Sequence, residues 1–176
     1  MVDIGARDVL YPRNLIQQRI AALAGEIDCR YRDMELVVIG VLKGAFVFMA
    51  DLIRCMKTPC VVDFVRLASY GSGTVTSGRI ALTKDIEIEI RGRDVLIVED
   101  IVDTGLTLSY LVEVLRSREP ASLAVCAFLD KRLRRQVPFD ADFVGFSMDD
   151  GFVVGYGLDY NEKARYLPDV YVVRNS

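Results

Sequence analysis

The sequence predicts an α/β fold: one central, mostly parallel sheet with helices on both faces, within a single domain that spans residues 1–176. Three observations support this prediction. Short β-branched apolar runs recur along the chain, segments with helical apolar spacing lie between them, and 176 residues with 52% hydrophobic composition suffice for one domain-sized core. Strands that alternate with helices form parallel sheets, because each crossover returns the chain across one face of the sheet.

The first half of the chain contains two predicted helices and two predicted strands. Pro12 offers a helix start, and apolar residues recur at helical spacing as far as about Cys29. The run LVVIGVL (36–42) is too short and too β-branched for a helix, so it predicts a buried strand. AFVFMADLIRCM (45–56) then predicts a helix, and the alternating VVDFVRLAS (61–69) predicts a strand.

The second half continues this alternation after a Gly/Ser/Thr-rich loop over 69–78. RIALTKDIEIEI (79–90) predicts a long strand, and DVLIVEDI (94–101) predicts a further buried strand. A helix is predicted over about 104–118, and it must stop before Pro120. Four more strands are predicted: SLAVCAFLD (122–130), DFVGFS (142–147), FVVGYGLD (152–159) and VYVVRN (170–175).

Composition excludes several classes of protein. The net charge of -3 argues against a nucleic-acid backbone as the main partner, although a small anionic ligand can still bind a local basic site. The chain contains no histidine, so His-dependent triads and His metal sites are excluded. The longest apolar run, over 37–53, contains Lys43 and Asp51, so no membrane-spanning helix is predicted.

The cysteines and the first residues indicate the compartment. No CxxC pair occurs among Cys29, Cys55, Cys60 and Cys126, so neither a disulfide framework nor a zinc site is predicted. The first ten residues, MVDIGARDVL, lack the basic and then apolar layout of a signal peptide. We therefore expect a cytoplasmic protein.

Two glycine-rich stretches resemble phosphate-binding motifs but do not meet their requirements. GTVTSGRI (73–80) has the glycine spacing of a P-loop, but Arg79 and Ile80 replace the Lys and the Ser/Thr, and a strand follows where a helix is needed. GSG (71–73) lacks the third glycine of a dinucleotide-binding fingerprint. Neither stretch therefore predicts a nucleotide site.

The stretch VLIVEDIVDTGLTL (95–108) predicts a binding site. Its buried strand delivers Glu99 and Asp100 to the carboxyl edge of the sheet, where ligands bind in open α/β folds. These two acids could hold ribose hydroxyls or a magnesium ion. The turn DTGLT (103–107) then leads into a helix, whose N-H groups and positive dipole end can cradle a phosphate. Alternatively, the Asp-Thr pair of this turn merely caps the helix.

The same stretch resembles the signature of the type I phosphoribosyltransferases, which bind phosphoribosyl pyrophosphate (PRPP). Further segments resemble the hypoxanthine-guanine branch of this family in the same order along the chain: LKGAFVFMADLIR (42–54), VDFVRLASYG (62–71), KR (131–132) and DFVGFSMDDGFVVGYGLDYNEKARYLPDVYVV (142–173). The similarity covers most of residues 10–175. It implies the type I phosphoribosyltransferase fold, with a small hood formed from N- and C-terminal segments.

The resemblance assigns the contacts to the ribose and its phosphate. In that family the acids matching Glu99 and Asp100 contact the ribose hydroxyls. The loop that wraps the 5′-phosphate matches Asp103, Thr104, Gly105 and Thr107. Asp103 also matches the proposed general base near N7 of the purine, a role that a carboxylate can fill. Many relatives carry lysine where this chain has Leu106, which implies one cation fewer near the phosphate.

Two segments resemble the pyrophosphate side of the family's site. The matching pyrophosphate loop is Leu42, Lys43 and Gly44, and its Leu-Lys peptide is typically cis in the family. Asp159 and Arg165 match an aspartate that binds magnesium and an arginine that binds pyrophosphate. Magnesium ligands are therefore implied at Glu99, Asp100 and Asp159. By pattern alone, LKG is an ordinary strand-to-helix turn, and the Asp159 and Arg165 pair is a charged start of a surface helix.

Residues near the purine are implied further along the chain. By resemblance, Lys131 donates to O6 of the base, which favours 6-oxopurines over adenine, whose 6-amino group is itself a donor. Phe152 matches the aromatic ring that stacks on the base, Val153 matches a residue whose backbone reads the base edge, and Asp159 lies on the same side. By pattern alone, KRLRR (131–135) is a solvated basic face, and Phe152 and Val153 are core residues of a strand.

A lid is implied at the end of the strand predicted over 61–69. Ser69 and Tyr70 resemble the start of a family loop that closes over the reacting centre. Closure would keep water away from an oxocarbenium-like ribosyl centre. Without the resemblance, this segment reads as a flexible hairpin.

The resemblance implies a reaction: transfer of the phosphoribosyl group from PRPP to N9 of hypoxanthine or guanine, with Mg²⁺ as cofactor. The expected partners are PRPP and a 6-oxopurine, with no nucleic acid and no membrane, and the chain is expected to form a homodimer or homotetramer. Two alternatives stay open. One is a phosphoribosyltransferase for xanthine or another base, and the other is a nucleotide-sensing regulator that binds RNA, which should show a strong basic face.

Overall fold

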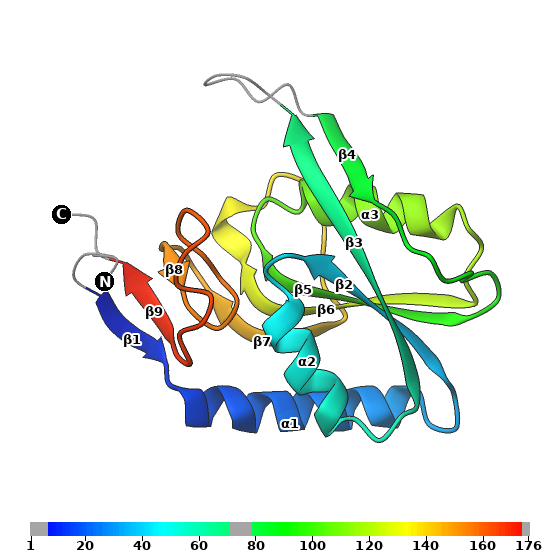
Figure 1. The fold of residues 1–176 in the computed structure, drawn as a ribbon, viewed down its shortest axis with the longest axis horizontal. Helices are drawn as coiled ribbons and strands as arrows, with labels where there is room; N and C mark the ends of the chain where they lie inside the picture. Colours follow the sequence, from blue (N-terminus) through cyan, green and yellow to red (C-terminus); the bar gives the residue numbers. More distant parts are fainter. Residues whose placement is uncertain (1–6, 71–78, 174–176) are drawn as a thin grey trace.

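The computed structural model describes residues 7–70 and 79–173, and it has the predicted α/β fold. A six-stranded sheet forms its centre, with the strand order β4-β3-β2-β5-β6-β7 (Figure 1). Its strands are β2 (Leu36–Leu42), β3 (Cys60–Tyr70), β4 (Arg79–Lys84), β5 (Asp94–Val102), β6 (Ser122–Lys131) and β7 (Phe143–Met148). All neighbouring strands are parallel except β3 and β4, which pair antiparallel.

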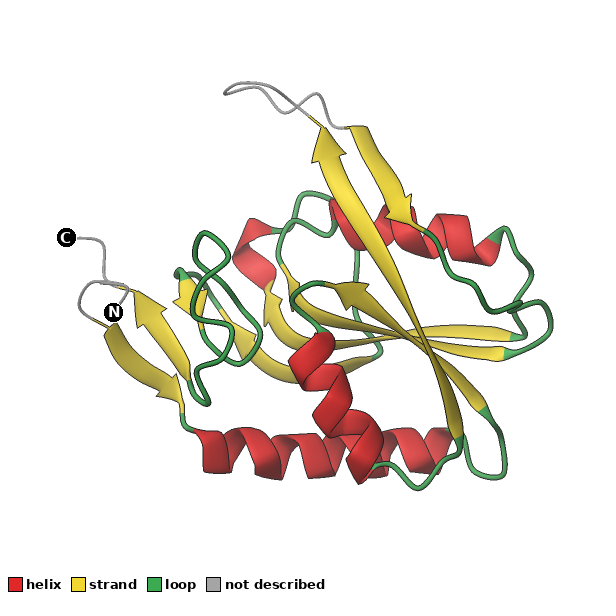
Figure 2. Cartoon of the chain, in the orientation of Figure 1, coloured by secondary structure: helices red, strands yellow, loops and turns green. Residues whose placement is uncertain are grey.

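Helices cover both faces of this sheet, as predicted (Figure 2). The helical elements of the described residues are α1 (Arg13–Arg30), α2 (Phe46–Cys55), α3 (Leu106–Arg116) and the 3-10 turn η1 (Arg132–Arg134). Strand β5 contributes to the hydrophobic core on each face of the sheet, because its successive side chains point to opposite faces. Leu96 and Val98 belong to the core cluster that contains α1 and α2 residues, whereas Val95 and Ile97 belong to the cluster that contains α3 residues. No helix among the described residues is long and apolar enough to cross a bilayer.

A second sheet joins sequence-distant parts of the chain beside the large one. It has the order β1-β9-β8, with β1 (Arg7–Tyr11), β8 (Val153–Val154) and β9 (Val170–Val173). In Figure 1, β1 and β9 lie side by side, and they pair antiparallel from Arg7 opposite Val173. Strand β1 was not among the predicted elements, because its partner lies more than 160 residues away in the sequence.

The predicted strand over 152–159 is mostly wrong. Only Val153–Val154 forms a strand, and isolated bridges follow it. The reason is backbone conformation: Gly155, Tyr156 and Gly157 have φ values of 97°, 51° and 96°. Three successive residues with positive φ cannot continue an extended strand, so the chain curls back on itself here.

The predicted strand over 79–90 is also too long, because β4 ends at Lys84. The following segment is held by a side chain rather than by a strand ladder. The Asp63 carboxylate on β3 accepts the N-H groups of Glu87 at 2.6 Å and of Ile88 at 2.9 Å. Asp63 is buried, and its other oxygen accepts the N-H of Phe64 at 2.7 Å. Alternating apolar residues alone could not reveal this competing partner.

Asp63→Asn should therefore destabilise the fold by about 1 to 3 kcal/mol, because an amide replaces the carboxylate that accepts these buried N-H groups. Burial alone would raise the pKa of Asp63, but hydrogen bonds from Ile88, Phe64 and Glu87 outweigh it and hold the pKa below its usual range. A lowered folded-state pKa contributes stability above the unfolded-state pKa, and this contribution is lost as the pH falls through the folded-state value.

Urea unfolding of both proteins at neutral and at acidic pH measures this effect. The difference in unfolding free energy should be largest at neutral pH and should shrink in acid. Asp149→Asn, a change at an exposed position, serves as the matched control. A difference that stays constant down to strongly acidic pH would contradict the assigned role of the Asp63 charge.

Candidate active site

The predicted site residues meet at one edge of the large sheet. Strands β2, β5 and β6 are parallel neighbours, so their carboxyl ends lie at the same edge. Leu42 ends β2, Glu99 and Asp100 lie in the last part of β5, and Lys131 ends β6. The sheet itself therefore brings together segments that are 30 to 90 residues apart in the sequence.

Glu99 and Asp100, here called the acid pair, are enclosed by neighbouring backbone. Glu99 is buried, and a Cβ atom at Gly44 would overlap the Asp100 carboxylate. Burial raises the pKa of both acids, and for Glu99 the charge of Asp100 raises the pKa further. The charge of Arg165 offsets only part of this rise for Asp100, so the two close carboxylates are suited to bind hydroxyl donors or a cation.

Gly44→Ala should raise the KM for PRPP at least about tenfold, because the added methyl group occupies the position of the Asp100 carboxylate and overpacking of this kind costs about 1 to 3 kcal/mol. Gly25→Ala in α1 is the matched control. A Cβ atom at Gly25 meets nothing within 4 Å, so this change should leave the kinetics unaltered and stabilise the helix by about 0.5 to 1 kcal/mol. Steady-state kinetics of both variants measure the effect, and similar KM values would contradict it.

Residues 103–107, here called the phosphate turn, lie directly before and within the first turn of α3. Gly105 has a φ of 84° and precedes the helix, which begins at Leu106 rather than at Thr104 as predicted. Because of this left-handed residue, the helix starts two residues later than its sequence pattern suggests. A hollow of about 90 Å³ lies over the turn, lined by Glu99, Ile101, Val102, Asp103, Thr104, Gly105, Thr107 and Leu108.

The alternative reading, in which this Asp-Thr pair merely caps α3, does not describe the turn well. The N-cap residue is Gly105, which has no side chain to cap the helix, and the Leu106 N-H donates only one long hydrogen bond, of 3.4 Å, to the Thr104 hydroxyl. Asp103 Oδ1 is buried and has no hydrogen-bond partner, while Asp103 Oδ2 lies 3.3 Å from Arg134 Nη1. A buried carboxylate oxygen without a donor is unusual and indicates a place for a ligand.

The predicted pyrophosphate residues lie beside the acid pair. The peptide between Leu42 and Lys43 is cis, as the resemblance implies. Arg165 donates to the Gly157 carbonyl at 2.7 Å, lies 2.7 Å from Asp159 Oδ1, and lowers the pKa of Asp100 by its charge. Its buried Nε has no partner. Asp159 therefore pairs with Arg165, but it does not begin a surface helix, because a series of turns occupies this segment.

One acidic residue in this region was not predicted. Glu162 lies 2.9 Å from Lys43 Nζ and 3.4 Å from Arg165 Nη2, so it connects the two predicted pyrophosphate cations. Lys43 and Glu162 are 119 residues apart in the sequence, and Glu162 has an uncommon φ of 64°. The only sequence signal was the cluster of charges in DYNEKAR, which any solvated surface turn could share.

The predicted purine residues lie near the end of β6 and at β8. Lys131 is 5% exposed, and its Nζ donates to the Gly151 carbonyl at 2.5 Å. Phe152 is 44% exposed, so it is not a core residue. Its ring packs edge-on against the ring of Tyr160, with 5.6 Å between the ring centroids. Val153 is buried and pairs with Val172, so the core reading describes its side chain. Only the backbone of Val153 is left to contact a ligand.

Two sets of predicted residues are not brought together as fully as expected. Among the described residues, no three acidic or cysteine groups converge as a preformed metal site, so Glu99, Asp100 and Asp159 do not form one ligand cluster by themselves. Ser69 and Tyr70 are the last residues of β3. The end of this strand extends, with β4, past the other strands of the sheet (Figure 1). The rest of the predicted lid, and most of the rejected P-loop over 73–80, lie outside the described residues.

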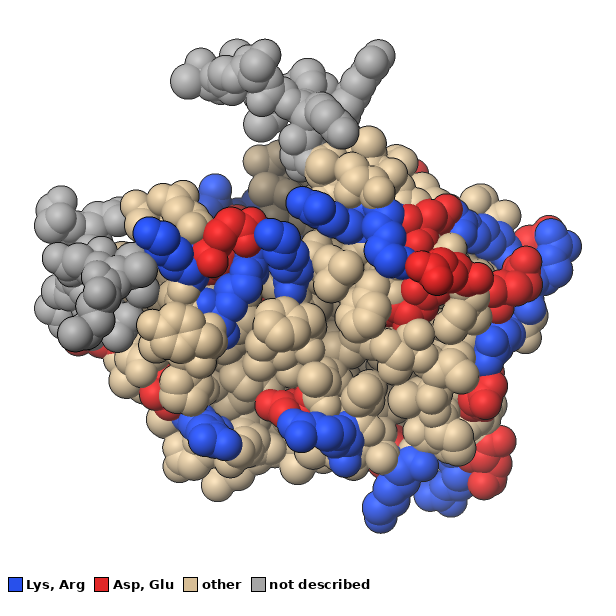
Figure 3. Space-filling model, viewed as in Figure 1, with Lys and Arg blue, Asp and Glu red and all other residues tan. Residues whose placement is uncertain are grey.

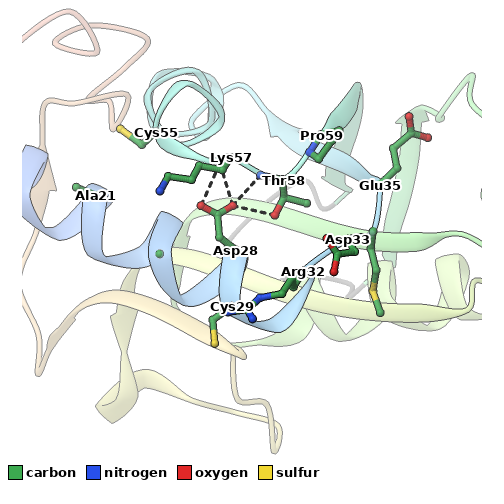
Figure 4. A pocket seen from close by; sticks show the side chains of 12 residues that line it. Ala21, Asp28, Cys29, Arg32, Asp33, Glu35, Cys55, Lys57, Thr58 and Pro59 are labelled. Atoms are coloured by element: carbon green, nitrogen blue, oxygen red, sulfur yellow. Dashed lines mark hydrogen bonds between the residues drawn. The ribbon is translucent and has the colours of Figure 1, made fainter.

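A wide hollow of about 990 Å³ lies at the opposite edge of the sheet and contains none of the predicted residues (Figure 4). One of its three acids, Asp28, ties α1 to the segment before β3 by accepting the N-H groups of Lys57 and Thr58 and the Thr58 hydroxyl. Glu35, another of these acids, pairs with Arg93, and none of the residues that line the hollow has a buried side-chain polar atom without a partner, as Asp103 has. The carboxyl edge therefore remains the candidate active site.

Surface charge is mixed on the face shown in Figure 3. There, Lys and Arg side chains are interspersed with Asp and Glu side chains among the described residues. Elsewhere in the described part of the chain as well, basic and acidic side chains form pairs, such as Arg93 with Glu35 at 2.6 Å and Arg118 with Asp85 at 2.7 Å. This face lacks the basic surface that an RNA-binding regulator should show.

Comparisons with known proteins show the family to which the chain is related. The family model described as "Phosphoribosyl transferase domain" matches residues 7–161. A hypoxanthine phosphoribosyltransferase of Salmonella typhimurium is 51% identical over 165 residues, covering 93% of each chain. A hypoxanthine-guanine phosphoribosyltransferase of Aquifex aeolicus is 48% identical and covers 91% of this chain and 90% of its own. The crystal structure of a hypoxanthine-guanine phosphoribosyltransferase from Bacillus anthracis, with HEPES in the active site, superposes with a TM-score of 0.91 at 44% identity, covering 95% and 98% of the two chains.

Proposed function

The chain belongs to the phosphoribosyltransferase family, and from this premise we propose a role for each residue at the carboxyl edge of its sheet. The reaction is purine salvage: transfer of the 5-phosphoribosyl group from PRPP to N9 of hypoxanthine or guanine, giving IMP or GMP and pyrophosphate. The main observation behind this assignment of residues is that they lie together at one edge of the sheet. The segment 42–44 at the end of β2, the acid pair of β5 with the phosphate turn after it, and the buried Lys131 at the end of β6 share this edge.

PRPP lies across the ends of β2 and β5 in this proposal. Its 5′-phosphate accepts hydrogen bonds from the backbone N-H groups of the phosphate turn and from the hydroxyls of Thr104 and Thr107. These donors lie at the positive end of α3. The ribose hydroxyls donate to the acid pair, whose pKa values burial raises. The pyrophosphate group lies between the Lys43-Gly44 loop and Arg165, whose buried Nε has no partner in the protein.

Magnesium fits this site together with the substrate rather than on its own. Mg²⁺ is usually held by one or two carboxylates, waters and substrate phosphates, and not by an all-protein cage. Asp159 on the pyrophosphate side and the acid pair on the ribose side offer such carboxylates without converging as three ligands. When bound, the ion would neutralise charge that builds on the pyrophosphate leaving group.

The purine lies between Lys131 and the ring of Phe152. Lys131 donates to O6, while the buried Asp103 Oδ1, which lacks a partner, accepts the proton from N7 as the base attacks C1′ of the ribose. A donor at Lys131 meets an acceptor on a 6-oxopurine but another donor on adenine, which disfavours adenine. Phe152 is exposed enough to stack on the ring, and the Val153 backbone reads its edge.

The remaining parts of the proposal concern the surroundings of the site. The sheet β1-β9-β8 is the hood of a single domain, and Ser69 and Tyr70 begin the lid. All four cysteines are free, which suits a reducing compartment such as the cytoplasm. The protein assembles as a homodimer or homotetramer, and its partners are PRPP and the purine base.

Nucleotide formation from PRPP and magnesium tests the proposal, with hypoxanthine, guanine, xanthine and adenine supplied in separate reactions. Turnover with hypoxanthine or guanine, but not with adenine, is the expected result. Turnover with xanthine alone would correct the base specificity. PRPP or nucleotide binding without turnover on any base would indicate a regulator instead, and the roles given to Asp103 and Lys131 would then be wrong.

A further inference from the structure

Arg135 connects two parts of the site without facing the substrate. Its Nη1 donates to the backbone carbonyl of Asp103 at 2.8 Å, and its Nη2 forms an ion pair with Asp130 Oδ1. The side chain is 15% exposed, in contrast to the solvated basic face that KRLRR predicts. One guanidinium thus holds the phosphate turn and the end of β6 at the same time, which a planar fork of donors does well.

The other end of this connection is rigid. Asp130 is 3% exposed in its side chain and immediately precedes Lys131 in β6. Its backbone is opposite Val102 in the ladder between β5 and β6, and Val102 immediately precedes Asp103. The carboxylate of Asp130 therefore lies beside the point where β5 leaves the sheet and the phosphate turn begins.

Residues 135–137, which follow η1, also contact the phosphate turn. The backbone N-H of Gln136 donates to the Thr104 carbonyl at 2.9 Å. A Cβ atom at Gly105 would lie 3.0 Å from Arg135 Cδ and 3.2 Å from Val137 Cγ2, so the alkyl stem of Arg135 packs closely against the turn. Contacts to residues 103, 104 and 105 all come from this one segment.

We propose that Arg135 is a positioning residue, whose ion pair with Asp130 fixes the phosphate turn relative to Lys131. This inference rests on the proposed function, because it assumes that the turn holds the 5′-phosphate and that Lys131 holds the purine. Lys131 is part of the sheet and stays in place without Arg135. The turn, in contrast, depends on Arg135 for the orientation of the Asp103 carbonyl, and with it for the position of the backbone N-H groups that hold the 5′-phosphate.

Arg135→Lys is the central test. Lysine keeps the charge opposite Asp130 but lacks the second arm that reaches the Asp103 carbonyl. The expected result is a rise in the KM for PRPP of about 10- to 100-fold, about the loss of one hydrogen bond to a charged group. The KM for hypoxanthine should change by less than about twofold, as for a substitution outside a binding contact. If Arg135 only stabilised the fold, the KM values for PRPP and for hypoxanthine would change by similar factors.

Arg132→Ala is the matched control, because Arg132 pairs with the same Asp130 carboxylate at 3.1 Å but is 70% exposed and does not contact the turn. Its kinetics should match the wild type within about twofold. Asp130→Asn combined with Arg135→Gln is a second variant, in which two amides replace the pair and no charge is left buried. It should show the same selective loss on PRPP, and circular dichroism and urea unfolding establish that it folds.

Three outcomes would overturn the inference: unchanged kinetics in Arg135→Lys or in the double variant, equal losses on PRPP and hypoxanthine, or equal losses in Arg132→Ala. None of these outcomes depends on the proposed function being wrong. The wild-type assay tests that function separately, because an inactive wild-type protein refutes the function whereas an active one with an indifferent Arg135 refutes only the positioning role.

Discussion

Replacing Asp103 with asparagine is expected to lower kcat by about 10²- to 10⁴-fold, the usual contribution of a general base. The amide keeps the shape of the side chain but cannot take the proton from N7. Asp103 Oδ1 is buried without a hydrogen-bond partner, so the ligand-free protein leaves this oxygen available to a substrate. Affinity for PRPP should remain nearly intact, because the phosphate turn binds through backbone N-H groups that the change does not touch.

Pre-steady-state turnover and calorimetric titration with PRPP separate these two effects. Asp140→Asn is the matched control, since Asp140 is exposed and lies outside the candidate active site. Wild-type turnover in Asp103→Asn would show that the general-base assignment is wrong. A loss confined to PRPP affinity would instead assign Asp103 to phosphate binding.

Lys131→Ala is expected to raise the KM for hypoxanthine by about 10- to 150-fold, which corresponds to the roughly 1.5 to 3 kcal/mol of a hydrogen bond to a charged group. Lys131 is 5% exposed, and its ammonium group already donates to a carbonyl, that of Gly151, so a carbonyl oxygen such as O6 suits its position. The variant should also discriminate less between hypoxanthine and adenine, because the donor that disfavours the 6-amino group is gone.

Initial rates with each base and with varied PRPP check this prediction. Lys57→Ala serves as control, because Lys57 is exposed at the opposite edge of the sheet. PRPP affinity should change little in Lys131→Ala. An equal loss of PRPP and purine affinity would contradict a role for Lys131 in base recognition.

Local sequence patterns predicted the parts of the fold that depend on neighbouring residues. The buried strands β2 and β5, the helices α1 and α2 and the turn after Val102 were all visible as apolar runs, periodicity and turn residues. The phosphate turn was predicted because a strand, two acids, an Asp-Thr-Gly turn and a helix follow one another within 95–108. Resemblance to a family then supplied the roles that these patterns could not assign.

Errors arose where a distant partner decided the local structure. Strand β1 exists because β9 pairs with it, and the segment after Lys84 leaves the strand ladder because Asp63 accepts its N-H groups. The KRLRR run looked like a solvated face, yet Arg135 is held by Asp130 and by the Asp103 carbonyl. Each case depends on a hydrogen bond or ion pair that periodicity does not encode.

The sequence by itself determined most of the strand and helix order, the α/β fold class and the chemical identity of the acid pair, of residues 103–107 and of Lys131. Only the tertiary structure decided which of these segments share an edge, that Asp103 Oδ1 lacks a partner, and that Arg135 supports the turn. The physical reason is the distance along the sequence over which each kind of interaction acts. Propensity, periodicity and capping act over a few residues, whereas burial, pairing and the position of a carboxylate depend on side chains that only folding brings together.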